Sequence, residues 1–174
     1  MGIFVAIIVI FIISIIYIYN RIITLRNHVY KSKSGIDVYL KQRFDLIPNL
    51  IEVTKEYINY EKEILERITE LRGIYNESKD VKATNELNIK YKTIMAVAEN
   101  NPDLKANEQF LKLQQSLIKV ESQLQAARRI YNNDVTRYNT KIAIFPNNIV
   151  ARWFNFKETE LFILDGEDKV SIKF

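Results

Sequence analysis

The chain has 174 residues, which allows one ordinary domain with an anchor, and 25 Lys and Arg against 21 Asp and Glu give a net charge of +4. The lack of Cys excludes disulfides, thiolate metal sites and Cys nucleophiles, and a single His leaves almost no room for a zinc site. A net charge this small does not indicate nucleic-acid binding, and the scarcity of Gly (4) and Pro (3) favours long helices over a turn-rich β fold.

The first 25 residues contain the most apolar segment. Ile3 to Tyr19 is a run of 17 residues with only Ser14 as a small polar exception, at the short end for a membrane-spanning helix. A cleaved signal peptide is the alternative, but Met1-Gly2 carries no basic residue and no small-x-small cleavage site follows the run. We predict an uncleaved anchor over residues 1–25, whose span and aromatic boundary are marked by Ile3, Ile10, Tyr17 and Tyr19.

Four basic residues follow the apolar run before the first acid at Asp37. They are Arg21, Arg26, Lys31 and Lys33. By the positive-inside rule, this cluster predicts a single-pass protein with its N-terminus outside and its C-terminal domain in the cytoplasm. The same side chains serve either as topology determinants only or also as contacts for anionic lipid headgroups.

Apolar residues that recur every three or four positions predict four helices after the anchor. The first has its weakest point at residues 31–35, where the anchor helix either runs straight on or has a hinge or register change. Pro48 predicts a helix boundary because the residue before a proline is disfavoured in the α region. The predicted segments are residues 21–44, 48–77, 82–99 and 104–145.

The last of these segments is the longest, and it predicts a helix roughly 60 Å long with one apolar side. Asn101 is a suitable N-cap before it, with Pro102 at the first helical position. The heptad spacing has one four-residue insertion after Ala127. The apolar positions are Phe110, Leu113, Leu117, Val120, Leu124, Ala127, Tyr131, Val135, Tyr138, Ile142 and Phe145.

A helix of that length with one apolar side needs other helices along it. We therefore predict an all-α fold in which a single transmembrane helix precedes an up-and-down bundle of long antiparallel helices over residues 26–148. Residues 149–174 are predicted to form a short tail that is irregular or contains a hairpin, because Asp165-Gly166 lies between two β-prone runs.

Several specific motifs are spread over the whole chain. They are Ile36-Asp37-Val38-x-Leu40-Lys41-x-Arg43-x-Asp45-Leu46-Ile47-Pro48-Asn49-Leu50, Tyr60-Glu61, Arg72, Pro102-x-Leu104-Lys105-Ala106-Asn107, Phe110-x-x-Leu113-Gln114-x-x-Leu117-x-x-x-Glu121 and Arg128-x-x-Tyr131-Asn132-x-x-Val135-x-x-Tyr138-Asn139-x-x-Ile142-x-x-Phe145-Pro146. With these motifs the sequence resembles the LemA family of bacterial membrane-anchored proteins. One departure is the absence of a tryptophan before Ile36, where Lys31-Ser32-Lys33-Ser34 stands. The resemblance implies one N-terminal span in the bacterial inner membrane, a helical bundle and no established enzymatic activity.

A repeated Tyr-Asn pair, Tyr131-Asn132 and Tyr138-Asn139, gives the long helix a polar stripe beside its apolar side. With two charged residues nearer the N-terminus, the stripe consists of Glu121, Arg128, Asn132 and Asn139. It is either a recognition strip for a peptide or partner helix, or a set of buried hydrogen bonds that fix helix register.

Three carboxylates, Asp37, Asp45 and Glu61, would approach one another if the first two helices form a hairpin. Such a group could bind a divalent cation or perform acid–base chemistry, but Lys41 and Arg43 are expected to pair with it. No catalytic residue, metal ligand or cofactor is predicted.

These observations favour a non-enzymatic scaffold or adaptor, held at the membrane and facing the cytoplasm. Its expected partners are the lipid bilayer and another membrane protein or complex, and no nucleic acid. The alternatives are a lipid-surface or envelope-stress sensor and a carboxylate-based, metal-dependent hydrolase.

Overall fold

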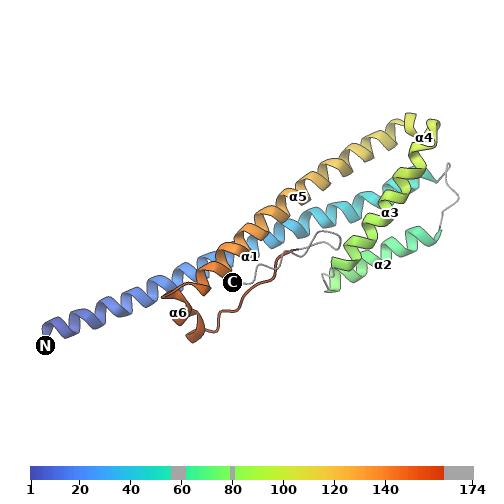
Figure 1. Ribbon diagram of the computed structural model, residues 1–174. Helices are drawn as coiled ribbons and strands as arrows, with labels where there is room; N and C mark the ends of the chain where they lie inside the picture. The colour runs from blue at the N-terminus through green and yellow to red at the C-terminus, as the bar shows by residue number, and fades with distance from the viewer. Residues whose placement is uncertain (56–61, 79–80, 163–174) are drawn as a thin grey trace. The chain divides into compact units, whose positions relative to one another are not determined.

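The computed structural model describes residues 1–55, 62–78 and 81–162, and every regular element within these ranges is an α-helix (Figure 1). The predicted all-α class is thereby confirmed. The helices are α1 (Gly2–Thr54), α2 (Lys62–Ser78), α3 (Val81–Glu99), α4 (Pro102–Ala106), α5 (Glu108–Ala143) and α6 (Asn147–Trp153).

The first of two compact units, unit 1, contains residues 1–36 and 126–162. The N-terminal part of α1, the C-terminal part of α5 and α6 belong to it (Figure 1). Its buried side chains recur at helical spacing, so each segment buries one apolar face when it folds as a helix. They are Ile22, Val29, Ile36, Ala127, Tyr131, Val135, Tyr138, Ile142, Val150 and Ala151.

The second compact unit, unit 2, contains the described residues between 37 and 125. Here α2 and α3 pack against each other in opposite directions, and α3 contacts α4 (Figure 1). The C-terminal part of α1 and the N-terminal part of α5 complete the unit. Its apolar core consists of Leu40, Phe44, Ile47, Leu50, Ile51, Ile68, Leu71, Tyr75, Leu87, Ile94, Ala98, Leu104, Phe110, Leu117, Val120 and Leu124.

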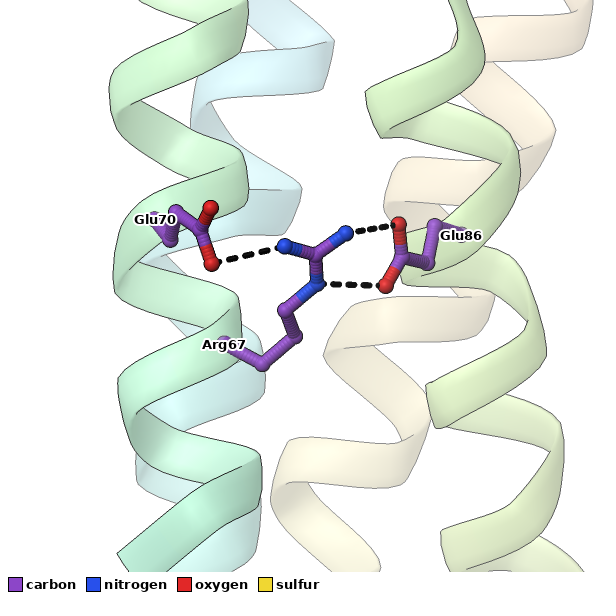
Figure 2. A network of polar contacts seen from close by, with 3 residues as sticks. All are labelled: Arg67, Glu70 and Glu86. Carbon is purple, nitrogen blue, oxygen red and sulfur yellow. Dashed lines mark hydrogen bonds and ion pairs between the residues drawn. The ribbon is translucent and has the colours of Figure 1, made fainter.

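An arginine joins α2 to α3 through a forked ion pair (Figure 2). The Nε and Nη2 atoms of Arg67 donate to the two carboxylate oxygens of Glu86 at 2.6 and 2.7 Å, and Nη1 donates to Glu70 at 2.6 Å. The hydrogen bonds to Glu86 and Glu70 raise the pKa of Arg67. Because a bidentate pair fixes both distance and orientation, it sets the register of the two helices.

The predicted helix boundary at Pro48 is wrong, because α1 continues through this residue to Thr54. A proline inside a helix costs about 3 kcal/mol through its missing N–H and its clash with the preceding turn. Ile47, Leu50 and Ile51 on either side are buried, and burial of each contributes about 1.5–3 kcal/mol. The apolar contacts of this turn therefore outweigh the local preference of the proline.

Of the two alternatives for residues 31–35, the structure shows the continuous helix, because α1 passes through them without interruption. Ser32 donates its hydroxyl to the carbonyl of His28 at 3.0 Å, and Ser34 donates to the carbonyl of Tyr30 at 3.1 Å. These serines satisfy their polar groups within the helix, so the polar stretch does not require a break.

The predicted long helix is interrupted at Asn107, between α4 and α5. Asn101 caps α4 as predicted, with its side chain accepting a hydrogen bond from the N–H of Leu104 at 3.5 Å. Asn107 then repeats this arrangement, because its Oδ1 accepts from the N–H groups of Gln109 and Phe110 at 2.9 and 3.1 Å. A side-chain cap of this kind favours a new helix start over continuation.

Beyond the interruption the predicted apolar stripe is buried from Leu117 to Ile142, but Phe145 at its end is 78% exposed. The irregular tail begins later than predicted, because residues 147–153 form α6 and bury Asn147 and Val150. Residues 156–162 have neither helix nor strand. The hairpin predicted around Asp165-Gly166 lies outside the described residues.

Candidate functional site

Four residues of α5 form hydrogen bonds to a segment of unit 1 that lies about 20–30 residues further along the chain. We call them the tyrosine–asparagine strip: Tyr131, Asn132, Tyr138 and Asn139. The seven-residue spacing places the two Tyr-Asn pairs on one side of α5, two turns apart. Both tyrosines are buried and both asparagines are half-buried. The polar groups of the strip therefore lie at the edge of the apolar core.

Each asparagine binds one residue of the extended segment 157–162 through two hydrogen bonds. The Nδ2 of Asn139 donates to the carbonyl of Thr159 at 2.8 Å, and its Oδ1 accepts from the N–H of Thr159 at 3.0 Å. Asn132 does the same with Phe162, donating to its carbonyl at 3.1 Å and accepting from its N–H at 2.8 Å. The side-chain amide thus pairs with the peptide group as a neighbouring β-strand would.

The two tyrosines add one hydrogen bond each to the same segment. The hydroxyl of Tyr138 donates to the carbonyl of Lys157 at 3.0 Å, and the hydroxyl of Tyr131 donates to the carbonyl of Glu160 at 3.1 Å. Burial raises the pKa of both tyrosines, so the hydroxyls keep the protons that they donate.

The spacing of the strip matches the repeat of an extended chain. Seven helical residues between Asn132 and Asn139 rise roughly 10.5 Å. Three extended residues between Thr159 and Phe162 span roughly 10 Å. Because Asn139 binds the earlier residue, the segment runs antiparallel to α5, and every hydrogen bond goes to a main-chain atom. The strip therefore recognises an extended backbone rather than a particular sequence.

Side chains of the C-terminal segment make separate contacts with basic residues. The guanidinium of Arg128 lies 5.4 Å from the ring centroid of Phe162, and that of Arg26 lies 5.3 Å from the ring centroid of Phe156. Cation–π contacts of this kind are worth about 0.5–2 kcal/mol, depending on desolvation. The hydrogen bonds of the strip recognise only the main chain of the segment. The two cation–π contacts add a preference for aromatic side chains at two of its positions.

The four residues of the predicted polar stripe thus contact two different parts of the chain. Arg128, Asn132 and Asn139 contact the segment 154–162, and the bound group is an extended peptide of the same chain. Glu121 instead forms an ion pair with Arg43 of α1. The two tyrosine hydroxyls were not predicted as polar contacts, although the repeated Tyr-Asn pair was the available signal.

The ion pair between Arg43 and Glu121 joins a buried cation of unit 2 to a carboxylate that is one-third exposed. The Arg43 side chain is 5% exposed, and its Nη1 donates to Glu121 at 2.5 Å. Burial lowers the pKa of Arg43, and the nearby Glu121 opposes this shift. The guanidinium also lies 5.7 Å from the ring centroid of Tyr91. A buried cation with one carboxylate partner makes this pair a structural requirement of the unit.

The predicted pairing of the three carboxylates with Lys41 and Arg43 is wrong for the residues that the structure describes. Asp37 accepts a hydrogen bond from the hydroxyl of Tyr75 at 2.6 Å, and Asp45 pairs with Arg72 at 2.6 Å. Arg43 is unavailable because it lies on the buried face of α1. Glu61 lies outside the described residues, and within them no three His, Asp or Glu side chains form a potential metal site.

Comparison with known proteins decides the family. The sequence pattern of the LemA family matches residues 32–174, a range that includes the strip and the segment bound to it. The chain belongs to the LemA family. It is 26% identical over 158 residues to Protein LemA of Metamycoplasma hominis, which covers 88% of this chain and 72% of that protein.

This LemA family member also resembles two proteins from Paramagnetospirillum magneticum, the magnetosome proteins MamQ 1 and MamQ 2. Each is 23% identical to it over 185 residues, covering 89% of this chain and 68% of the relative. The similarity therefore extends over most of the length of all three relatives.

The N-terminal part of α1 is long and apolar enough to cross a membrane, and none of the side chains in its most apolar stretch is buried. Ile3, Ile10 and Tyr17 are exposed, whereas Tyr19 is half-buried. Among the four basic residues after the run, Arg21, Lys31 and Lys33 are exposed and Arg26 is half-buried against Phe156. This LemA family member is therefore a membrane-associated helical protein.

Proposed function

We propose that the protein is a non-enzymatic adaptor of the bacterial inner membrane, with the tyrosine–asparagine strip as its recognition surface. The observation that carries the proposal is the set of six hydrogen bonds from the strip to main-chain atoms of residues 157–162. A surface that binds peptide groups accepts extended segments of many sequences, as strand addition does in other peptide-binding proteins. This property suits a scaffold better than an enzyme.

In this proposal the segment 157–162 is a competitor that an extended segment of a partner displaces. The competitor is tethered, so its effective concentration at the strip is on the order of millimolar. A partner dissolved in the cytoplasm at micromolar concentration would rarely displace it. A partner held in the same membrane is concentrated near the strip, so the adaptor is expected to select membrane proteins.

The test uses variants that act on the strip and on its competitor separately. The double variant Asn132→Ala/Asn139→Ala removes the four amide hydrogen bonds, and Asn133→Ala is the matched control because Asn133 is an exposed neighbour on the same helix. Thr159→Pro removes the N–H group that donates a hydrogen bond to Asn139, and it leaves the residues of the strip unchanged.

Membranes carrying each variant would be crosslinked, and the recovery of co-purified membrane proteins compared quantitatively. We expect recovery to fall in the double variant, to rise in Thr159→Pro and to match the parent in Asn133→Ala. If the strip and tail variants change recovery in the same direction, the segment acts only as part of the fold and the strip is not the recognition surface.

The proposed topology places the N-terminus outside and the remaining chain in the cytoplasm, because four basic residues follow the apolar run before the first acidic one. The lack of Cys allows single labels at Gly2→Cys and Asn107→Cys. A membrane-impermeant thiol reagent applied to intact cells should label position 2 and leave position 107 unmodified. Labelling of position 107 alone would show that the orientation is opposite to the proposed one.

A further inference from the structure

A group of large apolar side chains around α6 is exposed to solvent. The group, called the α6 patch, comprises Ile144, Phe145, Ile149, Trp153 and Phe154, which are 43–78% exposed. The opposite face of α6 already packs into unit 1 through Asn147, Val150 and Ala151. Ile149 and Trp153 are four positions apart within α6, so they lie on the same outer side of this helix. Large apolar side chains that are exposed together around a short helix indicate a site of protein or membrane contact.

The α6 patch adjoins the end of the membrane-spanning stretch. Phe154 packs on Tyr19 with ring centroids 4.6 Å apart, and Phe156 packs on the same ring at 5.7 Å. Tyr19 is the last residue of the apolar run. If the run spans the bilayer, Tyr19 lies at headgroup level, where Tyr and Trp are enriched. Direct ring contact then holds α6 at the same depth.

The charge around the α6 patch suits a phospholipid surface. No acidic residue occurs between Asp134 and Glu158, whereas Arg152 lies within α6 and Lys157 follows it. Both basic side chains are exposed. Exposed aromatic and aliphatic residues beside basic residues are typical of helices that lie in the membrane interface.

We propose that the α6 patch inserts into the interfacial layer of the bilayer beside the point where α1 leaves it. This contact is distinct from the adaptor role and rests only on the membrane insertion of α1. It gives unit 1 a second attachment to lipid, next to the span. The attachment orients α6 and the segment that follows it with respect to the membrane plane.

Trp153 is the only tryptophan of the chain and lies within the α6 patch, so its fluorescence tests the proposal without any substitution. The full chain is reconstituted into phosphatidylcholine–phosphatidylglycerol vesicles, with and without lipid brominated near the top of the acyl chains. We expect blue-shifted emission, quenching by the brominated lipid and loss of quenching by aqueous acrylamide. The reference is Trp153→Phe/Ile118→Trp, which places the tryptophan at a 57% exposed position of α5 in unit 2 and should show the opposite pattern.

Two results would overturn the proposal. Red-shifted emission with full acrylamide quenching would place the patch in water, and protection from acrylamide without quenching by brominated lipid would place it against protein, such as a second copy. Resistance to extraction by alkaline carbonate, measured on the same vesicles, reports insertion of α1 separately. If the chain resists extraction but Trp153 shows no lipid contact, the inference about the α6 patch is wrong and the proposed function is unaffected.

Discussion

Replacing Asn139 with alanine should detach the backbone of Thr159 while leaving the helices in place. The substitution removes two hydrogen bonds, of 2.8 and 3.0 Å, from a half-buried site. At about 0.5–1.5 kcal/mol net for each bond, local opening becomes easier by about 1–3 kcal/mol. That difference corresponds to an increase of about 5- to 150-fold in the exchange rate of the Thr159 amide hydrogen.

Hydrogen exchange on the full chain in lipid nanodiscs measures this rate at single residues. Asn132→Ala should have its largest effect at Phe162, because its Oδ1 accepts from that N–H. Asn133→Ala, at an exposed neighbouring position, should change neither amide. An Asn139→Ala variant whose Thr159 amide exchanges within about twofold of the parent would refute the pairing, since the loss of even one hydrogen bond exceeds that change.

Two further predictions concern unit 2. Glu121→Ala leaves the buried cation of Arg43 without its carboxylate. It should lower the free energy of unfolding, measured by urea titration, by about 2–3 kcal/mol, a value reduced because Glu121 itself is one-third exposed. The control Glu108→Ala breaks an exposed ion pair and should lower the free energy of unfolding by under about 0.5 kcal/mol. Burial and the hydrogen bond to Asp37 raise the pKa of Tyr75, so its stabilising contribution is complete below about pH 10 and is lost as the pH rises above that value. Tyr75→Phe should cost about 1 kcal/mol at neutral pH and abolish this alkaline loss, and unchanged alkaline unfolding would contradict the assignment.

Helical periodicity predicted which side chains are buried, but not where the helices end. The stripe from Leu117 to Ile142 is buried as its spacing indicates. The two misplaced ends, at Pro48 and Asn107, each depend on a balance between a local preference and tertiary contacts. Burial of three neighbours prevails at Pro48, whereas a side-chain cap prevails at Asn107. A single sequence shows the local preference of each residue for a helix or a helix end, but not the strength of the tertiary contacts that oppose this preference.

The site was predictable on one side only. The seven-residue repeat placed Asn132 and Asn139 on one side of the helix, and both side chains bind the same segment in the structure. The segment itself could not be predicted, because its main-chain atoms form the hydrogen bonds and every sequence has the same main chain. Its aromatic contacts are Phe156 with Arg26 and Phe162 with Arg128, and two aromatic residues among many apolar ones do not identify a contact.

The strip and the α6 patch act on adjacent parts of the same short stretch of chain. Only three residues separate Trp153 at the end of α6 from Lys157, the first residue bound by the strip. With α6 fixed in the membrane interface, a displaced segment stays within a few residues' reach, roughly 3.3–3.6 Å for each. Its effective concentration therefore remains high after release, and the strip closes again unless a partner binds persistently. Weakening the lipid contact of α6 should then make the strip easier for a partner to occupy, without any change in the strip itself.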